Sequence, residues 1–436
     1  MWPVVIGIAC VVIAVLGFCC NSTSKSNEVE EAGPQTEQKV AKAAGDGNAQ
    51  KKKKLAKCKP AAEFRHPLLL TTFKGHGGEV TSFDVSSNGK YLISTATDRS
   101  LFIWNMKELN TAGKGVKSVR GNVEYDSANL IKFSPDNKSF ITSLDNANSI
   151  RVFKMSKNDD GIMGKVQAVM DFQATHTEVI MSIGIDSSGN YLMTADNGTR
   201  VDIFNLKGDI LHSIDTGTMK NSSACVSPCG RFVAVSGFTP DVKVWEVSFD
   251  KVKQFKSVKR AFDLTGHNAG VLSVAFSADS SRAATVAKDM TWKLWNIDVE
   301  YEQGQDPSLL CTGKIAEKPE EAIIALSPNG KTVAIAIENN IVVYNVITQQ
   351  ADVSMTGIFS SEIRHVAFSV DECGKYLFCC GDRQVKVFNN VTGYRSKIDY
   401  LNKELRNCNQ TAERRLNEQL QDASNALAQL EKQSSS

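Results

Sequence analysis

Three histidines stand at one fixed distance from an aromatic residue farther along the chain. In each case the aromatic residue follows the histidine by 28 positions. A histidine beside a hydroxyl group can serve as the general base of a nucleophilic enzyme, or it can belong to a buried hydrogen-bond network. The pairs are His76 and Trp104, His176 and Phe204, and His267 and Trp295.

Two of these pairs have a complete set of polar companions. Asp98 and Asp289 stand six residues before the tryptophan, and Ser94 and Thr285 stand four residues earlier still. A buried carboxylate or imidazole is costly unless hydrogen bonds satisfy it, so such groups belong in closed networks. A fixed spacing repeated on rigid strands therefore predicts structural tetrads rather than catalytic residues. The third pair keeps a partial set, which consists of His176, Thr194 and Phe204.

The elements that carry these residues form a repeat that runs from residue 66 to residue 390. Each unit reads as an apolar strand, a turn of the type Ser-x-x-Gly-Lys/Arg, a second strand, a polar turn and a third strand that ends in an aromatic residue. Short strands alternating with turns predict an all-β domain. A period between 41 and 51 residues is typical of propeller blades. The closing aromatic residues are Trp104, Phe153, Phe204, Trp245, Trp295, Tyr344 and Phe388.

The repeat resembles the WD40-repeat family, in which His, Ser or Thr, Asp and Trp tie the inner strands of a blade together. The resemblance implies a seven-bladed WD40 β-propeller, and closure of the ring removes exposed sheet edges. The seventh unit ends at Asn389 without a further strand, whereas the apolar run Leu68–Phe73 precedes the first unit. We therefore expect Leu68–Phe73 to supply the outer strand of blade seven.

The start of the chain differs from the rest. Residues 2–20 carry no charge and are close to the ~20 residues that a transmembrane helix requires. A cleaved signal peptide is the alternative, but it would have a basic start and a small-residue cleavage site, whereas residues 18–20 read Phe-Cys-Cys. We expect an uncleaved transmembrane anchor at residues 1–20, and the lysines that follow it predict a cytosolic location for the bulk of the chain.

Residues 21–65 are rich in Ser, Glu, Gln, Ala, Gly and Lys. This composition predicts a disordered basic linker between the anchor and the propeller. Its lysine cluster could contact anionic lipid, bind RNA, imitate a nuclear localisation signal or simply be solvated. The candidate electrostatic contact consists of Lys51, Lys52, Lys53 and Lys54.

The last segment, residues 391–436, has a helical composition. Apolar residues recur at steps of three and four between Ile398 and Leu430, with charged residues between them. This pattern predicts one C-terminal amphipathic helix with a short tail. The helix could pack on the propeller, pair with itself or receive a partner. Its many Ala, Asn and Gln residues make a weak seam, which favours docking or partner binding over self-association.

Composition and motifs narrow the possible functions. Lys and Arg number 50 and Asp and Glu 48, and the net charge of +2 argues against a body built to coat nucleic acid, so we expect no DNA partner. Eleven cysteines in 436 residues fit neither a secreted disulfide scaffold nor a zinc module. The sequence has no nucleotide-binding, metalloprotease, hydrolase or kinase signature, so we expect no enzyme activity, metal or cofactor. The cysteines interpreted as buried thiols are Cys225, Cys229, Cys379 and Cys380.

Two segments, Ser227–Val247 and Thr291–Pro307, resemble a membrane-anchored branch of the WD40 family in more than the generic repeat. This resemblance implies a single-pass endoplasmic-reticulum protein with a cytosolic propeller. It also implies a protein-binding scaffold in the unfolded protein response, linked to the stress-activated initiation-factor kinase of that membrane and to translation under stress. The residues leave two other hypotheses open: an RNA- or ribosome-binding module that uses the lysine cluster, and an enzyme in the propeller channel.

Overall fold

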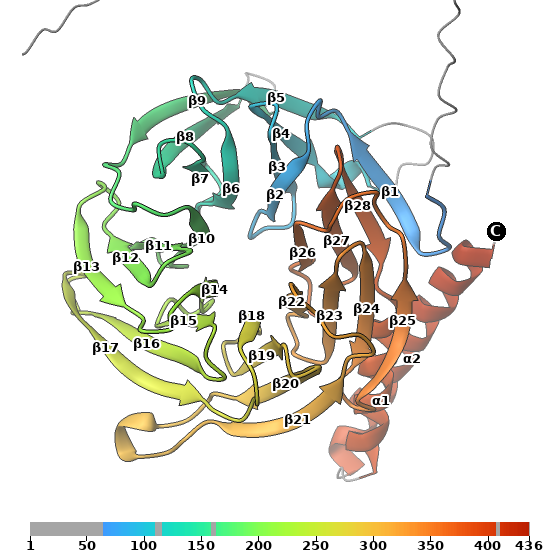
Figure 1. Ribbon diagram of the computed structural model, residues 1–436. Coiled ribbons are helices and arrows are strands. Elements are labelled where there is room, and N and C mark those ends of the chain that lie inside the picture. The colour runs from blue at the N-terminus through green and yellow to red at the C-terminus, as the bar shows by residue number, and fades with distance from the viewer. Residues whose placement is uncertain (1–63, 110–115, 158–162, 407–409, 436) are drawn as a thin grey trace, which may run out of the picture. The chain divides into compact units, whose positions relative to one another are not determined.

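The computed structural model describes residues 64–109, 116–157, 163–406 and 410–435. In these residues the chain forms seven four-stranded antiparallel sheets, which are arranged as blades around a central channel (Figure 1). The first strand of each blade lines the channel, and the later strands lie progressively farther out. The predicted seven-bladed all-β propeller is therefore confirmed.

Blades one to three follow directly from the first repeats. Blade one contains β2 (Val80–Val85), β3 (Tyr91–Ala96), β4 (Ser100–Asn105) and β5 (Ser118–Asn122), with a short 3-10 helix, η1 (Met106–Glu108), after β4. Blade two contains β6 (Ala128–Phe133), β7 (Ser139–Leu144), β8 (Ser149–Lys157) and β9 (Met163–Asp171). Blade three contains β10 (Ile180–Ile185), β11 (Leu192–Asp196), β12 (Arg200–Phe204) and β13 (Ile210–Asp215).

Blades four to six repeat the same order. Blade four contains β14 (Asn221–Val226), β15 (Phe232–Gly237), β16 (Val242–Phe249) and β17 (Phe255–Leu264). Blade five contains β18 (Val271–Phe276), β19 (Arg282–Ala287), β20 (Thr291–Asn296) and β21 (Ser308–Lys314), with η2 (Tyr301–Gln303) before β21. Blade six contains β22 (Ile323–Leu326), β23 (Thr332–Ile337), β24 (Asn340–Asn345) and β25 (Gln350–Met355).

Blade seven is built from both ends of the propeller. Its inner three strands are β26 (His365–Phe368), β27 (Tyr376–Gly381) and β28 (Gln384–Asn389), and its outer strand is β1 (Leu69–Lys74). β1 pairs antiparallel with β28, with Thr72 opposite Lys386 and Phe73 opposite Val385. The expectation that the run before the first repeat completes blade seven is confirmed. This pairing closes the ring by hydrogen bonds between strands that are far apart in sequence.

The alternation of strand direction sorts the loops onto two faces of the ring. The loop that leads into the first strand of a blade lies on the same side as the turn between its second and third strands. We call this side the histidine face, because these leading loops carry His76, His176 and His267. The turns between first and second strands, and between third and fourth strands, form the opposite face.

The core lies between neighbouring blades. Middle strands such as β3 are buried on both sides and read as continuous apolar and small residues, whereas the outer strand β5 alternates between exposed and half-buried positions. One apolar cluster joins Phe73, Trp104 and Phe378, which come from blades seven and one. Blade contacts of this kind make each sheet part of its neighbour's core.

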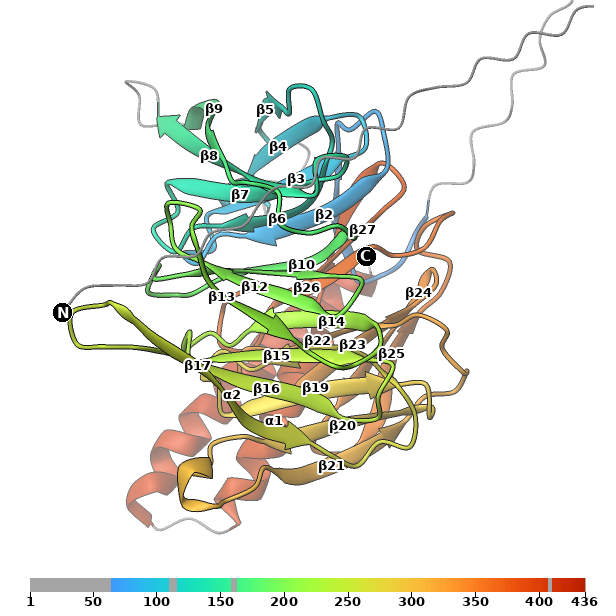
Figure 2. The ribbon, with the colours of Figure 1, turned by 60° about the vertical axis from the view of Figure 1, so that its left-hand side comes forward.

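Two helices follow blade seven, α1 (Val391–Leu405) and α2 (Gln410–Ser435), so the prediction of a single C-terminal helix is wrong (Figures 1 and 2). The first helix ends at Leu405 and the second begins at Gln410. Arg395 of α1 pairs with Glu431 of α2 at 3.0 Å, which holds the two helices side by side.

The first helix docks on blade six. The side-chain amide of Asn345 in β24 donates to Asp399 of α1 at 2.7 Å, and Arg395 pairs with Asp352 of β25 at 2.9 Å. The hydroxyl of Thr392 also donates to Asp352 at 2.7 Å. Of the roles considered for the tail, packing on the propeller is therefore the one that the described residues adopt.

Several predictions concern the part of the chain before residue 64. The anchor at residues 1–20, nearly all of the linker at 21–65 and the lysine cluster at 51–54 lie outside the described residues. Within the described ranges, no helix combines the length and the apolar character that a membrane crossing requires.

Candidate functional site

Blade five holds one complete tetrad, as the spacing predicted. Oγ1 of Thr285 lies 2.8 Å from Nε2 of His267 and accepts a hydrogen bond from Nε1 of Trp295 at 2.9 Å. On the other side of the ring, Nδ1 of His267 lies 3.0 Å from the carboxylate of Asp289. The hydroxyl of Thr291 also donates to this carboxylate, at 2.7 Å. One chain of hydrogen bonds thus joins the leading loop to β19 and β20.

Blade one holds the second tetrad with one difference. Nε2 of His76 lies 2.7 Å from Oγ of Ser94, which accepts from Nε1 of Trp104 at 2.9 Å. Asp98 is not bonded directly to the histidine, since its carboxylate lies 3.8 Å from Nδ1. The hydroxyl of Ser100 stands between them, 2.7 Å from Nδ1 and donating to Asp98 at 2.5 Å. Nδ1 therefore carries the proton, and Nε2 accepts from Ser94.

Electrostatics keep both histidines neutral near pH 7. Burial lowers the pKa of His76 to about 4, although the nearby carboxylate of Asp98 acts to raise it. Burial likewise lowers the pKa of His267, against the opposing hydrogen bond and charge of Asp289. A neutral imidazole needs one donor and one acceptor partner, which each blade supplies.

The same geometry argues against catalysis by these groups. A hydroxyl, an imidazole and a carboxylate in line have the arrangement of a catalytic triad, but a nucleophile must also reach substrate and an oxyanion site. The side chains of Ser94 and Thr285 are fully buried, and each already accepts a hydrogen bond from a tryptophan. The networks suit internal ties between strands.

Blade three contains the partial set with an additional carboxylate. Nε2 of His176 lies 2.6 Å from Oγ1 of Thr194, and Nδ1 lies 3.0 Å from the buried Asp196. Asp202, which is fully buried, lies 3.6 Å from Nε2. Phe204 is also buried, but it has no ring N–H to complete the tetrad. Hydrogen bonds to Asp202 from Arg200, Ser213 and Thr175 outweigh its desolvation and lower its pKa.

Blade two lacks the histidine, and a carboxylate connects its leading loop to the turn after the second strand instead. Asp126 is buried in the leading loop and accepts hydrogen bonds from the backbone N–H groups of Asn146 and Ala147 in the turn after β7. The side-chain amide of Asn146 adds a third bond of 2.7 Å. Thr142, the fourth residue of β7 as Ser94 is of β3, is fully buried, and its hydroxyl has no hydrogen-bond partner among the described residues.

Sequence reasoning missed Asp126, Asp202 and the two hydroxyls beside the histidines. Ser100 and Thr291 each stand four residues before the tryptophan of their blade, so the repeated spacing contained the signal for these hydroxyls. Asp126 and Asp202 occur once each at their positions, and a single carboxylate has no periodic signal. Their partners include groups that only the fold brings near.

One prediction about the cysteines is wrong. Cys379 and Cys380 are buried and Cys225 is half-buried, but Cys229 is exposed. It lies in the turn between β14 and β15, on the opposite face. Desolvation acts to raise the pKa of this thiol, but hydrogen bonds from Ser227, Ser280 and backbone N–H groups outweigh it and lower the pKa. A turn residue has no neighbouring strand to cover it.

The channel has a volume of about 740 Å³ and a few titratable side chains on its wall. Lys132 is paired with Asp84 at 2.9 Å, and Nδ1 of His365 lies 3.0 Å from the carbonyl oxygen of Phe83. Burial lowers the pKa of His365 to about 4 and raises the pKa of the Cys225 thiol to about 12. At neutral pH the described channel wall therefore offers a neutral imidazole and a protonated thiol, not an activated nucleophile.

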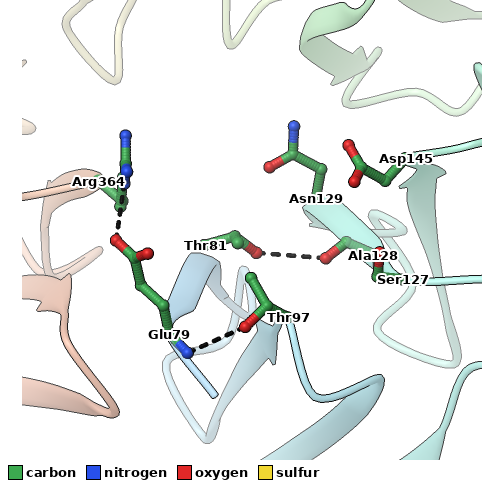
Figure 3. Close-up of a pocket in the computed structure, with 8 residues that line it drawn as sticks. All are labelled: Glu79, Thr81, Thr97, Ser127, Ala128, Asn129, Asp145 and Arg364. Carbon is green, nitrogen blue, oxygen red and sulfur yellow. Dashed lines mark hydrogen bonds and ion pairs between the residues drawn. The ribbon is translucent and has the colours of Figure 1, made fainter. Parts of the chain in front are cut away.

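A smaller pocket of about 270 Å³ opens on the histidine face between blades seven, one and two (Figure 3). Glu79 and Arg364 form an ion pair of 2.9 Å on one side, and the hydroxyl of Thr81 donates to the carbonyl of Ala128 at 3.2 Å. Asp145 lines the other side and has no salt bridge to another described residue. The pocket is suited to a small polar or cationic group.

Comparison with known proteins assigns the chain to a family. The profile described as "WD domain, G-beta repeat" matches residues 68–105 and 258–296, which contain the three inner strands of blades one and five and both complete tetrads. Fold and match together define a WD40-repeat propeller protein. Transducin beta-like protein 2 of Homo sapiens is 42% identical over 393 residues, which cover 89% of this chain and 87% of that protein. The chain belongs to the transducin beta-like protein 2 family.

Other relatives show how far the similarity extends. Transducin beta-like protein 2 of Mus musculus is 42% identical over 392 residues, or 89% of this chain and 88% of that protein. Periodic tryptophan protein 2 of Saccharomyces cerevisiae is 27% identical over 172 residues, which are 39% of this chain and 17% of that protein. The first resemblance spans most of the chain, and the second is restricted to part of it.

Proposed function

We propose that this protein is a non-catalytic, membrane-tethered scaffold of the endoplasmic reticulum. The observation that carries the proposal is that the histidine–hydroxyl pairs are hydrogen-bonded inside the blades. The accessible surface is therefore formed by the two loop-covered faces of a rigid ring. Loops on a rigid framework bind partners at a low entropic cost. Kinship with transducin beta-like protein 2 fits this role.

The proposed location is the reticulum membrane, with residues 2–20 inserted and the propeller in the cytosol. The sequon at Asn197 offers a test, because this side chain is exposed on the histidine face, whereas the sequon asparagines Asn221 and Asn390 are buried. We expect no shift on endoglycosidase H treatment of the full chain. A matched variant with a cleavable signal peptide in place of residues 1–20 should acquire glycan. Glycosylation of the unaltered chain would contradict the cytosolic orientation.

The proposed partner is the stress-activated initiation-factor kinase of the same membrane, in unfolded-protein-response signalling and translation under stress. Tethering raises the effective concentration of the propeller near other membrane proteins. Crosslinked immunoprecipitation from intact membranes, with and without residues 2–20, at rest and under stress, tests this. We expect the kinase to be recovered with the full chain and reduced by the deletion. If an unrelated single-pass membrane protein recovered as much of the kinase as this protein does, the proposal would be contradicted.

A second candidate function is an RNA- or ribosome-binding module. The cluster Lys51–Lys54 favours it, because phosphate contacts by lysine give strong, salt-dependent binding. Changing these four lysines to glutamate should abolish RNA crosslinking if this function holds, and should leave kinase recovery unchanged if the propeller faces bind protein. RNA crosslinking that persists in this variant and at high salt would exclude the cluster as the RNA site.

A further inference from the structure

The histidine face of blades two to four carries four large apolar side chains that are open to solvent. Tyr125 is 91% exposed, Met219 78%, Phe238 63% and Val179 48%. Tyr125, Val179 and Met219 lie in the loops that lead into β6, β10 and β14, and Phe238 lies in the turn between β15 and β16. We call these four residues the apolar rim. Monomeric proteins seldom gather such side chains on one face without a binding role.

Backbone hydrogen bonds show that the loops of the rim are neighbours. The N–H of Asn197 donates to the carbonyl of Val179 at 2.9 Å, and the N–H of Asn221 donates to Gly198 at 2.8 Å. The N–H of Phe238 then donates to the carbonyl of Lys220 at 3.0 Å. Val179, Met219 and Phe238 therefore follow one another along a continuous edge.

The loop of Tyr125 is connected to this edge through one arginine. The guanidinium of Arg151 donates to the carbonyl of Glu124 at 2.7 Å and pairs with Asp171 at 2.6 Å. Asp171 ends β9 and so begins the loop that carries Val179. Blades two, three and four thus present their apolar side chains on adjoining loops.

Two members of the rim are held in a backbone conformation that bulky side chains seldom adopt. Tyr125 has φ of 65° and Met219 has φ of 63°. The left-handed region usually belongs to Gly, Asn or Asp, and for a bulky residue it costs about 1 kcal/mol or more. Because both side chains are exposed in the described part of the chain, their burial does not offset this backbone cost. Backbone strain of this kind is often found at binding surfaces.

Exposed carboxylates surround the rim. Glu124, Asp145 and Glu178 are exposed, and none of them forms a salt bridge to another described residue. In the described structure the histidine-face loops of blades two to four offer one exposed lysine, Lys220, and the nearby Arg151 and Arg200 are paired with Asp171 and Asp202. Asp145 also lines the pocket of about 270 Å³ beside blade one. The surface around the apolar side chains is therefore negatively charged.

We propose that the apolar rim and its carboxylates are the docking surface for a segment of a protein partner whose apolar side chains are flanked by Lys or Arg. This inference rests on the proposed scaffold function and specifies the face and the chemistry. Apolar anchors of the partner would cover Met219 and Phe238, and a cationic side chain would lie beside Asp145 in the pocket. Phosphate backbones and anionic lipid would be repelled by the same carboxylates.

The experiment uses the full chain in detergent and a phage-displayed library of random dodecapeptides as the probe. An enriched peptide is then synthesised with a fluorescent label, and its Kd is measured by anisotropy. We expect enriched peptides that combine Phe, Leu or Trp with Lys or Arg. The double substitution Met219→Asp with Phe238→Asp should raise Kd about tenfold or more, because hot-spot residues are lost and negative charge is added at the rim. Kd should also rise with salt concentration.

A matched double variant provides the control. Val252 and Leu206 are 76% and 55% exposed, but they lie in turns between third and fourth strands, on the opposite face. Val252→Asp with Leu206→Asp should change Kd less than twofold. Thermal melting of both double variants should match that of the unaltered chain, because all four side chains are exposed and Asp tolerates the left-handed backbone at position 219.

The outcomes separate the two levels of the argument. If the enriched peptides are acidic, or bind equally well to both double variants, the apolar rim is not the docking surface. The proposed scaffold function would then stand, with binding through another part of the protein. Failure to enrich any peptide above background would contradict both the surface and the proposed scaffold function. Selective loss with the Met219 and Phe238 variant supports both.

Discussion

Two threonines at equivalent strand positions should respond in opposite ways to the same substitution. Thr285 in blade five is fully buried, and its hydroxyl contacts Nε2 of His267 and Nε1 of Trp295 at 2.8 and 2.9 Å. Valine has nearly the shape of threonine, so Thr285→Val removes these bonds without creating a cavity. Two buried polar atoms are then left without a partner, at about 1–3 kcal/mol each. We expect the free energy of unfolding to fall by about 2–6 kcal/mol.

Thr142 in blade two is the contrasting case. It is the fourth residue of its strand, as Thr285 is, and it is equally buried, but no described group bonds its hydroxyl. A buried hydroxyl without a partner costs about 1–3 kcal/mol in proteins. Thr142→Val removes that cost, so this variant should be as stable as the unaltered chain or more stable, by up to about 2 kcal/mol.

Urea denaturation of the full chain, followed by tryptophan fluorescence, compares the two variants. Hydrogen exchange of the strands shows whether each effect is local to its blade. We expect Thr285→Val to lower the free energy of unfolding and Thr142→Val to leave it unchanged or raise it. Equal destabilisation by the two substitutions would mean that shape, and not hydrogen bonding, sets the contribution of this position, and the role assigned to the tetrads would have to be abandoned.

Three further outcomes follow from the ring and its ionisable groups. Deletion of residues 66–74 should raise hydrogen exchange in blade seven more than in blade one, because β1 pairs with β28; the reverse order would contradict the closure. The pKa of His76 in the folded protein, about 4, is below the ordinary histidine pKa of 6.5, so the unfolded chain binds more protons in this pH range. His76 should therefore contribute about 3 kcal/mol to the rise in stability between pH 4 and 6.5, and the rise should be smaller by about that amount in a His76→Gln variant. Site-resolved iodoacetamide labelling near pH 7.5 should modify Cys229 before Cys379, because the first thiol is exposed with a lowered pKa and burial raises the pKa of the second.

The sequence was sufficient to predict those features whose geometry requires a fixed spacing between residues. The hydroxyl of Thr285 on β19 reaches His267 in the leading loop only at one strand register, so the 28-residue interval to Trp295 predicts the tetrad and the blade together. The closing strand was predictable for a related reason, because a seventh unit with three strands leaves an open edge, and Leu69–Lys74 pairs with that edge. Both inferences depend on pairing rules and not on side-chain detail.

The features that the sequence did not predict depend on tertiary contacts that do not recur from one repeat to the next. The tie that Asp126 makes in blade two uses backbone N–H groups of a turn 20 residues later. The exposure of Cys229 depends on what the neighbouring turns leave uncovered. The division into α1 and α2 interrupts a continuous apolar stripe, and the ion pair of Arg395 with Glu431 forms only once the two helices meet.

Blades two and four, which lack a histidine in the leading loop, each turn a bulky left-handed side chain outward. In blade two, Tyr125 stands next to Asp126, whose carboxylate fixes the leading loop through Asn146 and Ala147. In blade four, Met219 stands next to Thr218, which donates to the side chain of Asn221 at 2.7 Å. The substitute ties are thus adjacent to both left-handed residues of the rim.

This adjacency makes Asp126 a positioning residue for the rim. Asp126→Ala would free the loop and let Tyr125 relax from φ of 65°, without removing any apolar side chain. We expect Kd for the enriched peptide to rise severalfold, while Asp126→Asn, which keeps one acceptor oxygen, retains most of the affinity. Hydrogen exchange at Asn146 and Ala147 should increase in the alanine variant, since their N–H groups lose their acceptor. Faster exchange without any change in Kd would show that the loop conformation is irrelevant to binding, and would leave the exposed area of the rim as the only source of affinity.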